Sequence, residues 1–124
     1  MILRKAIGTS IGILGLFGAL AVTTTQAEAH AQLVSSNPAP DATVAAPQLI
    51  MLQFNEPLEA RISHFELKNA HGDILSVSAS EAPDDKSIVG TPESSLSPGL
   101  YNVDWSVAGD DGHPMSGHFS FTVE

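Results

Sequence analysis

A strict alternation of apolar and polar side chains near the C-terminal end constrains the fold of this chain more than any other feature. The alternating apolar positions are Tyr101, Val103, Trp105 and Val107 in one segment and Phe119, Phe121 and Val123 in the next. Because successive side chains of a β-strand point to opposite faces, each segment is predicted to be a strand with one face in a core. Residues 108–116 between them contain Gly, Asp, His and Pro, which indicates a hairpin loop.

Shorter segments of the same kind precede this pair. The clearest covers residues 48–54, where Ile50, Leu52 and Phe54 occupy alternate positions. We expect the other strands at residues 30–36, 65–67, 74–77 and 88–89, and no more helix than a single turn at 58–63. About seven short strands separated by turns predict an all-β fold, an antiparallel β-sandwich of immunoglobulin-like or Greek-key type, with Trp105 and Tyr101 in its core.

Residues 1–29 have the pattern of a cleaved secretory signal peptide. Arg4 and Lys5 precede an apolar stretch of about 17 residues, which is marginal for a membrane anchor because a span needs about 20. Ala27-Glu28-Ala29 supplies the small residues of a cleavage site, which favours the cleaved signal over the anchor. Residues 30–124 then form one small domain. A second reading of the site, Ala29-His30-Ala31, places cleavage before Gln32 instead.

The mature chain is strongly acidic and contains no cysteine. Residues 30–124 carry three basic and thirteen acidic side chains, so the net charge is 3 − 13 = −10 with histidine neutral. Nucleic acids and anionic membrane surfaces would repel such a chain, whereas cations would be attracted. The absence of cysteine excludes thiolate metal sites, thiol nucleophiles and disulfides, so stability must come from the core or from a ligand.

Two side chains in the hairpin loop are candidate metal ligands. Asp111 and His113 are two residues apart, so in an extended backbone they point to the same side. Taken alone, such a pair is ordinarily a turn with a surface histidine. Cleavage after Ala29 adds a third group, because a terminal His30 offers its α-amine and its Nδ1 as a chelating pair, unless that residue is simply frayed. An α-amino pKa of about 7.7 to 8 lets a metal displace the proton near neutral pH.

Together these groups supply three nitrogens and one oxygen. A tetragonal set of nitrogen and oxygen ligands favours Cu(II), which also heads the affinity series of the divalent metals. The residues therefore suggest one Cu(II) ion per chain.

Four segments carry a resemblance to a known family. They are His30-Ala31 at the cleavage site, Leu-Gln-Phe-Asn-Glu-Pro-Leu-Glu at 52–59, Pro-Gly-x-Tyr-x-Val-x-Trp at 98–105, and Asp-Gly-His-Pro at 111–114 with its following Ser-Gly-x-Phe-x-Phe. Through these segments, which are spread over essentially its whole length, the mature chain resembles the periplasmic copper-resistance CopC family. The resemblance implies a cupredoxin-like seven-stranded β-sandwich and a periplasmic location.

The resemblance also implies residue roles. His30 would hold Cu(II) through its amine and imidazole, and His113 and Asp111 would complete the ligand set. Glu56 matches a glutamate that lies beside the copper, where it would accept a hydrogen bond from the amine or act as a weak ligand.

The sequence departs from the methionine-rich members of the family. The mature chain contains only Met51 and Met115, both expected to fill space in the fold, so we expect no dedicated Cu(I) site. His64, His71 and His118 have no convergent partners in the sequence and are expected to be solvated surface residues.

The leading functional hypothesis is a soluble, monomeric copper-binding protein for copper homeostasis and resistance, and not an enzyme. It would buffer Cu(II) or deliver it to a partner such as an inner-membrane copper importer. One alternative is a copper-dependent oxygenase of the terminal-histidine type. However, Asp111 would occupy a position with a hard anion, which favours retention of Cu(II) over redox cycling. The other alternative is a metal-free immunoglobulin-like interaction module, which would need neither His30 at the terminus nor Asp111.

Overall fold

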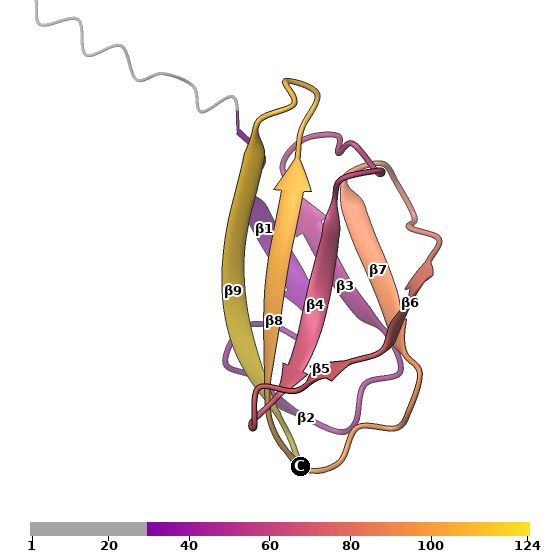
Figure 1. Cartoon of the computed structure of the whole chain (residues 1–124), viewed down its shortest axis with the longest axis vertical. Helices are drawn as coiled ribbons and strands as arrows, with labels where there is room; N and C mark the ends of the chain where they lie inside the picture. The colour runs from indigo at the N-terminus through magenta and orange to yellow at the C-terminus, as the bar shows by residue number, and fades with distance from the viewer. Residues whose placement is uncertain (1–29) are drawn as a thin grey trace, which may run out of the picture.

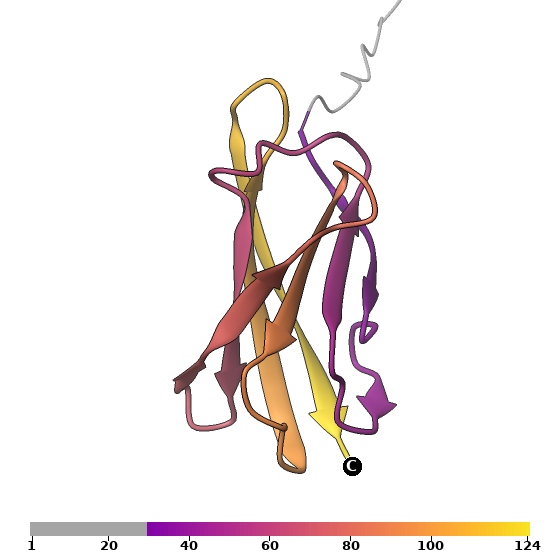
Figure 2. The same ribbon diagram turned by 90° about the vertical axis from the view of Figure 1, so that its right-hand side faces the viewer.

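The computed structural model describes residues 30–124, which form two β-sheets packed face to face (Figure 1; Figure 2 gives the side view). The four-stranded sheet has the order β1 (Leu33–Asn37), β3 (Ile50–Phe54), β7 (Ser87–Pro92) and β6 (Val77–Ser80). The five-stranded sheet has the order β2 (Thr43–Val44), β9 (Pro114–Val123), β8 (Gly99–Ala108), β4 (His64–Asn69) and β5 (Ile74–Leu75). The expected signal peptide, residues 1–29, lies outside the described residues. No helix within the described range is long and apolar enough to cross a bilayer.

The all-β sandwich expected from the alternation is confirmed, with differences in detail. The described residues contain nine strands where about seven were expected, because β2 and β5 are only two residues long and too short to display an alternation. The segment expected as one strand at 74–77 divides at Ser76, where the chain leaves one sheet and enters the other. The pairing of β2 with β9 is parallel, whereas the other strand pairs are antiparallel.

The structure corrects the expected start of the first strand and shows a turn where one was expected. The first strand begins at Leu33 rather than His30, because the preceding residues pack against the end of β3 instead of extending the ladder. The segment at 58–63, where at most a single helical turn was expected, contains a turn closed by the Ile62 N–H donating to the Glu59 carbonyl at 3.2 Å.

Inward-facing side chains of both sheets fill a continuous core. The largest fully buried ones are Phe54, Phe121, Ile50, Leu52, Leu67, Val103 and Val107. Each stabilises the fold by about 1.5–3 kcal/mol relative to an exposed side chain. Without disulfides, this burial is the main source of stability in the described chain.

Of the two aromatic residues expected in the core, Tyr101 lies in it and Trp105 packs against it. Trp105 is half-buried and meets Phe54 edge to face, with ring centroids 5.2 Å apart. Its indole crosses Gly117 on the neighbouring strand, in space that a Cβ would otherwise fill. Tyr101 is buried and stacks on Phe121, and its hydroxyl donates to the Ser97 carbonyl at 2.7 Å.

The long hairpin of β8 and β9 positions the polar loop singled out in the sequence. Its ten residue pairs run without interruption from Gly99 opposite Val123 to Ala108 opposite Pro114. The loop at its tip, residues 109–113, therefore projects from one end of the sandwich. The first described residues lie at this same end (Figure 1).

Candidate metal centre

The start of the described chain is fixed against the end of β3. Ala31 is only 1% exposed and belongs to the hydrophobic core. The Gln32 N–H donates to the Asn55 side-chain oxygen at 2.8 Å, and the Asn55 N–H donates to the Gln32 carbonyl at 3.0 Å. Two reciprocal hydrogen bonds and a buried side chain thus hold His30 in place from its C-terminal side.

The hairpin loop is ordered by its own hydrogen bonds. The Gly112 N–H donates to the Gly109 carbonyl at 2.9 Å, and Gly112 has φ +73°, a conformation that glycine adopts without steric cost. The His113 N–H then donates to Asp111 Oδ1 at 3.1 Å, closing an Asx turn. This bond fixes the Asp111 carboxylate and leaves its second oxygen directed elsewhere.

That second oxygen is the point on which two histidines converge. Asp111 Oδ2 lies 3.5 Å from His30 Nδ1 and 3.4 Å from His113 Nδ1. Each of the three residues offers a ligand atom within 4.8 Å of the other two, and no further group of this kind occurs among residues 30–124. The three metal ligands expected from the sequence therefore lie together. The His113 side chain is 69% exposed and Asp111 only 27%, so the cluster opens to solvent on the His113 side.

Two buried polar atoms at this end of the molecule lack hydrogen-bond partners. They are His30 Nδ1 and Glu56 Oε1. Buried polar atoms are normally paired, so an unpaired one calls for a physical explanation. An imidazole nitrogen without a partner, directed at a carboxylate and a second imidazole, is a donor set that suits a transition-metal ion.

Glu56 lies next to this cluster but is not a member of it. Its carboxylate covers Gly109 and lies in the space that a side chain at position 109 would occupy. The surrounding segment is tied to the hairpin, because Leu58 forms an isolated bridge with Gly109 and the Glu59 N–H donates to the Ala108 carbonyl at 2.9 Å. The requirement for a glycine at 109 could not be deduced from the sequence, where it looked like an ordinary loop residue.

The other histidines lie apart from the cluster. His64 and His118 are exposed on the outer face of the five-stranded sheet, where His64 is opposite Ser106 and His118 is opposite Asp104. His71 lies in the turn between β4 and β5, and its N–H donates to the Asn69 side chain at 3.0 Å.

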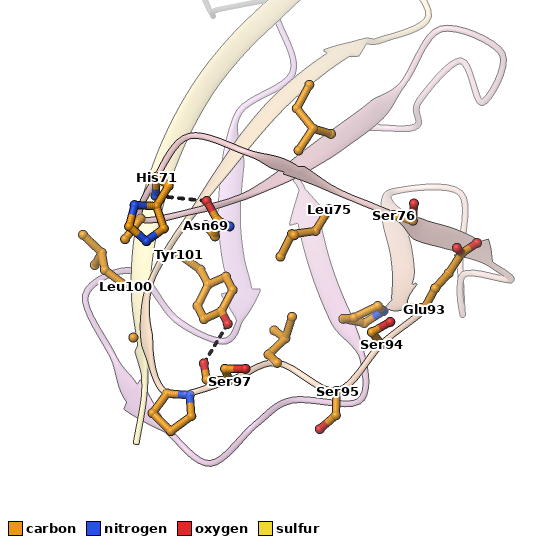
Figure 3. A pocket seen from close by; sticks show the side chains of 16 residues that line it. Asn69, His71, Leu75, Ser76, Glu93, Ser94, Ser95, Ser97, Leu100 and Tyr101 are labelled. Atoms are coloured by element: carbon orange, nitrogen blue, oxygen red, sulfur yellow. Dashed lines mark hydrogen bonds between the residues drawn. The ribbon is translucent and has the colours of Figure 1, made fainter.

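The turn that carries His71 also borders a separate pocket. This pocket has a volume of about 590 Å³ and is lined by residues of the turn and of the loop before β8 (Figure 3). This pocket contains none of the clustered ligands, so it is separate from the candidate metal centre.

The two methionines of residues 30–124, Met51 and Met115, lie in different sheets. Met115 is half-buried and packs against the core, whereas Met51 is half-buried on β3. Met115 is opposite Val107 in the hairpin, so its packing role agrees with the expectation from the sequence.

The chain matches a family model over nearly all of the described residues. The CopC domain model aligns with residues 33–124. The chain belongs to the CopC family. Copper resistance protein C of Escherichia coli is 38% identical, over 99% of this chain and 98% of the relative. Copper resistance protein C of Xanthomonas campestris pv. juglandis is also 38% identical, over 86% of this chain and 89% of the relative.

Solved CopC-family structures share the fold. The crystal structure of PcoC, a methionine-rich copper resistance protein from Escherichia coli, is 36% identical and superposes with a TM-score of 0.72, covering 77% of this chain and all of that one. CopC from Methylosinus trichosporium OB3b is 29% identical with a TM-score of 0.70, covering 77% of this chain and 94% of that one. The sandwich is therefore of the cupredoxin-like CopC type, and the family consists of copper-binding resistance proteins rather than enzymes. The oxygenase alternative is accordingly set aside.

Proposed function

We propose that this protein is a periplasmic Cu(II)-binding protein of copper homeostasis and resistance, with one Cu(II) held by His30, Asp111 and His113. The observation that carries the proposal is the convergence of both imidazole Nδ1 atoms on Asp111 Oδ2, at 3.5 and 3.4 Å. The E. coli and X. campestris relatives are named copper resistance proteins, which agrees with this cargo.

The chemistry of the donor set favours Cu(II) over other ions. Two imidazoles and a carboxylate, completed by the α-amine of a terminal His30, provide three nitrogens and one oxygen. Such a set matches the tetragonal preference of Cu(II), and cysteine thiolates, which would favour Cu(I) or Zn(II), are absent from the sequence.

The proposal requires that signal cleavage leave His30 at the N-terminus. Cleavage before Gln32 would remove a ligand, and it would also remove Ala31 from the core, where that residue is 1% exposed. The packing of Ala31 thus supports cleavage before His30 over the alternative site.

Glu56 is proposed to accept a hydrogen bond from the His30 amine. Its Oε1 is buried without a partner, and the residue follows Asn55, which is hydrogen-bonded to Gln32 at the chain terminus. A carboxylate that accepts a hydrogen bond from the metal-bound amine would orient the amine and make it a stronger donor to the metal.

We further propose that the site is single and lacks a dedicated Cu(I) partner site. PcoC is described as methionine-rich, whereas the mature chain here has only Met51 and Met115, which lie on different strands of different sheets. Two methionine thioethers on different sheets do not supply the soft ligand set that Cu(I) prefers.

Delivery to an inner-membrane importer is the proposed downstream step, with the protein acting as a monomer. Copper transport protein CutJ of Bacillus subtilis is 30% identical to 77% of this chain, which corresponds to 18% of that relative. A segment similar to this domain is therefore part of a larger protein named for copper transport, which supports a transfer role.

The decisive experiment compares the exported protein with a variant carrying one extra glycine before His30. We expect the exported protein to begin at His30 by intact-mass measurement and to bind one Cu(II). The extended variant should bind much more weakly, because its amine is no longer part of the chelate. Equal affinities would refute the terminal-histidine site. Metal-free protein after purification, together with no binding on titration with Cu(II), would favour the interaction module.

A further inference from the structure

A second pocket lies on the flank of the sandwich, and none of the three clustered ligands lines it. It has a volume of about 480 Å³, within the range typical of binding pockets. Its apolar walls come from Leu58, Phe65, Val77, Ile88 and Val89. The floor is formed where the side chains of Phe65 and Val77 meet over Gly90, in space that a Cβ there would occupy.

The pocket exists because one strand leaves its neighbour part-way along. β5 pairs with β4 only at Leu67 and Lys68, and continuing that register would bring Val77 opposite Phe65. Val77 instead pairs with Pro92 of β7 in the other sheet. Figures 1 and 2 show β6 running away from β4 toward β7.

The departure of β6 exposes a sheet edge beside the pocket. His64, Phe65 and Glu66 pair with β8 on one side, and no strand of the described chain pairs with them on the other. The Asn69 N–H donates to Asp73 on the β5 side, at 3.0 Å. Because backbone groups alternate in direction along a strand, the N–H and C=O of Phe65 also face this open side.

The charged residues around the pocket indicate which kind of partner could bind there. Its titratable lining residues are His64, Asp84 and Asp85, and no Lys or Arg lines it. Asp84 already accepts hydrogen bonds from the Lys86 N–H and the Ser87 hydroxyl, both at 2.9 Å, whereas Asp85 is exposed. A second copy of this chain, with its excess of carboxylates, would be repelled.

We propose that this flank binds an extended segment of another protein, with an apolar side chain flanked by Lys or Arg. The segment adds a short strand to β4 through the free backbone groups of Phe65. Its apolar side chain enters the pocket, and its basic residues face Asp85. Strand addition of this type takes its affinity from main-chain hydrogen bonds and its specificity from pockets for alternate side chains. This inference is independent of copper.

The test uses the exported, metal-free protein and a blocked peptide, acetyl-Lys-Thr-Leu-Thr-Lys-amide, followed by ¹⁵N NMR. Saturable shifts are expected at the amides around the pocket and the open edge, namely in the ranges 58–66, 77–80 and 84–90, and not in the rest of the chain. Ala79 lines the pocket and Ser78 points to the opposite face of the same strand. Ala79→Trp should therefore weaken binding by about tenfold or more, whereas the matched control Ser78→Trp should bind as the parent does.

A charge variant provides a second test that does not depend on the folding of Ala79→Trp. Asp85→Asn should weaken binding by about two- to fivefold, and Glu124→Gln, at the C-terminus, should have no effect. The proposal is overturned if the peptide shifts amides elsewhere, if it shows no saturation at millimolar concentration, or if Ala79→Trp folds and binds normally. Concentration-dependent dimerisation that Ala79→Trp abolishes would identify a second copy as the occupant and would also overturn it.

Discussion

The imidazole rings of His30 and His113 have centroids 5.4 Å apart, although the residues precede strands of different sheets. His30 precedes β1 of the four-stranded sheet, and His113 directly precedes β9 of the five-stranded sheet. A metal ion bound to both would therefore cross-link the two layers at one end of the sandwich. In a chain without disulfides such a link should contribute measurably to stability.

Copper should raise the thermal stability in a pH-dependent manner. An ion that binds the folded state preferentially stabilises it by about 4 kcal/mol at a thousandfold excess over Kd, less any binding by the unfolded terminus. Because ligating imidazoles and amines must first lose a proton, the increase in Tm on adding Cu(II) should be large at pH 7.5 and smaller at pH 5. Differential scanning calorimetry would check this. A shift of equal size at both pH values, or an equal shift with Cu(I), would contradict the site.

Substitution of the ligands should produce graded losses of affinity. His113→Ala should weaken Cu(II) binding more than Asp111→Ala, because imidazole is the better Cu(II) ligand and water can partly replace a carboxylate oxygen. Competition with a chelator of known affinity measures both. His64→Ala and His71→Ala serve as controls, since neither residue belongs to the cluster. A large loss from either control would mean that the site lies elsewhere.

The contact between Glu56 and Gly109 should matter for copper more than for folding. Glu56→Gln should reduce Cu(II) affinity by about 10- to 100-fold. Gly109→Ala places a methyl group where the carboxylate lies, so the flexible Glu56 side chain must move and a similar loss is expected. Because both changes act through the same carboxylate, the losses should not add in the double variant. Additive losses, measured by the same competition, would show that Gly109 acts independently of Glu56.

The ion pair of Lys68 and Asp104, at 2.8 Å, predicts a pH effect of its own. The hydrogen bond and charge of Asp104 raise the pKa of Lys68 above its ordinary value of 10.5. A raised pKa means that the pair stabilises the fold fully below the ordinary lysine pKa and loses this contribution as the pH rises through the higher value. Titration of the Lys68 side chain by NMR should give a lower midpoint in Asp104→Asn. An unchanged midpoint would exclude the ion pair as the cause.

The long strands were the easiest part of the fold to predict. The alternation from Tyr101 to Val107 and from Phe119 to Val123 extends over enough residues to specify a face and a register. The two-residue strands β2 and β5 have no pattern of that length, and their pairing depends on where neighbouring strands place them. The passage of the chain from one sheet to the other at Ser76 likewise depends on tertiary contacts. Nothing in the local sequence distinguishes this segment from a continuous strand.

The residues of the candidate site could be singled out from the sequence, but the contacts that support them could not. Asp111 and His113 share a loop, and the cleavage pattern drew attention to His30, so their types and spacing were informative. The bonds between Gln32 and Asn55 join parts of the chain far apart in sequence, and the fit of Glu56 over Gly109 depends on the absence of one Cβ. Contacts of this kind arise only after folding and leave no periodic signal.

The ten paired residues of β8 and β9 make the hairpin independent of the few residues at its tip. Residues 110–113 can consequently be exchanged for other short turns while the strands below keep their register. The tip could therefore be varied separately from the two strands that carry it. In evolution or in the laboratory, a few codon changes there could alter the ligands of the proposed metal site while the rest of the domain stays unchanged.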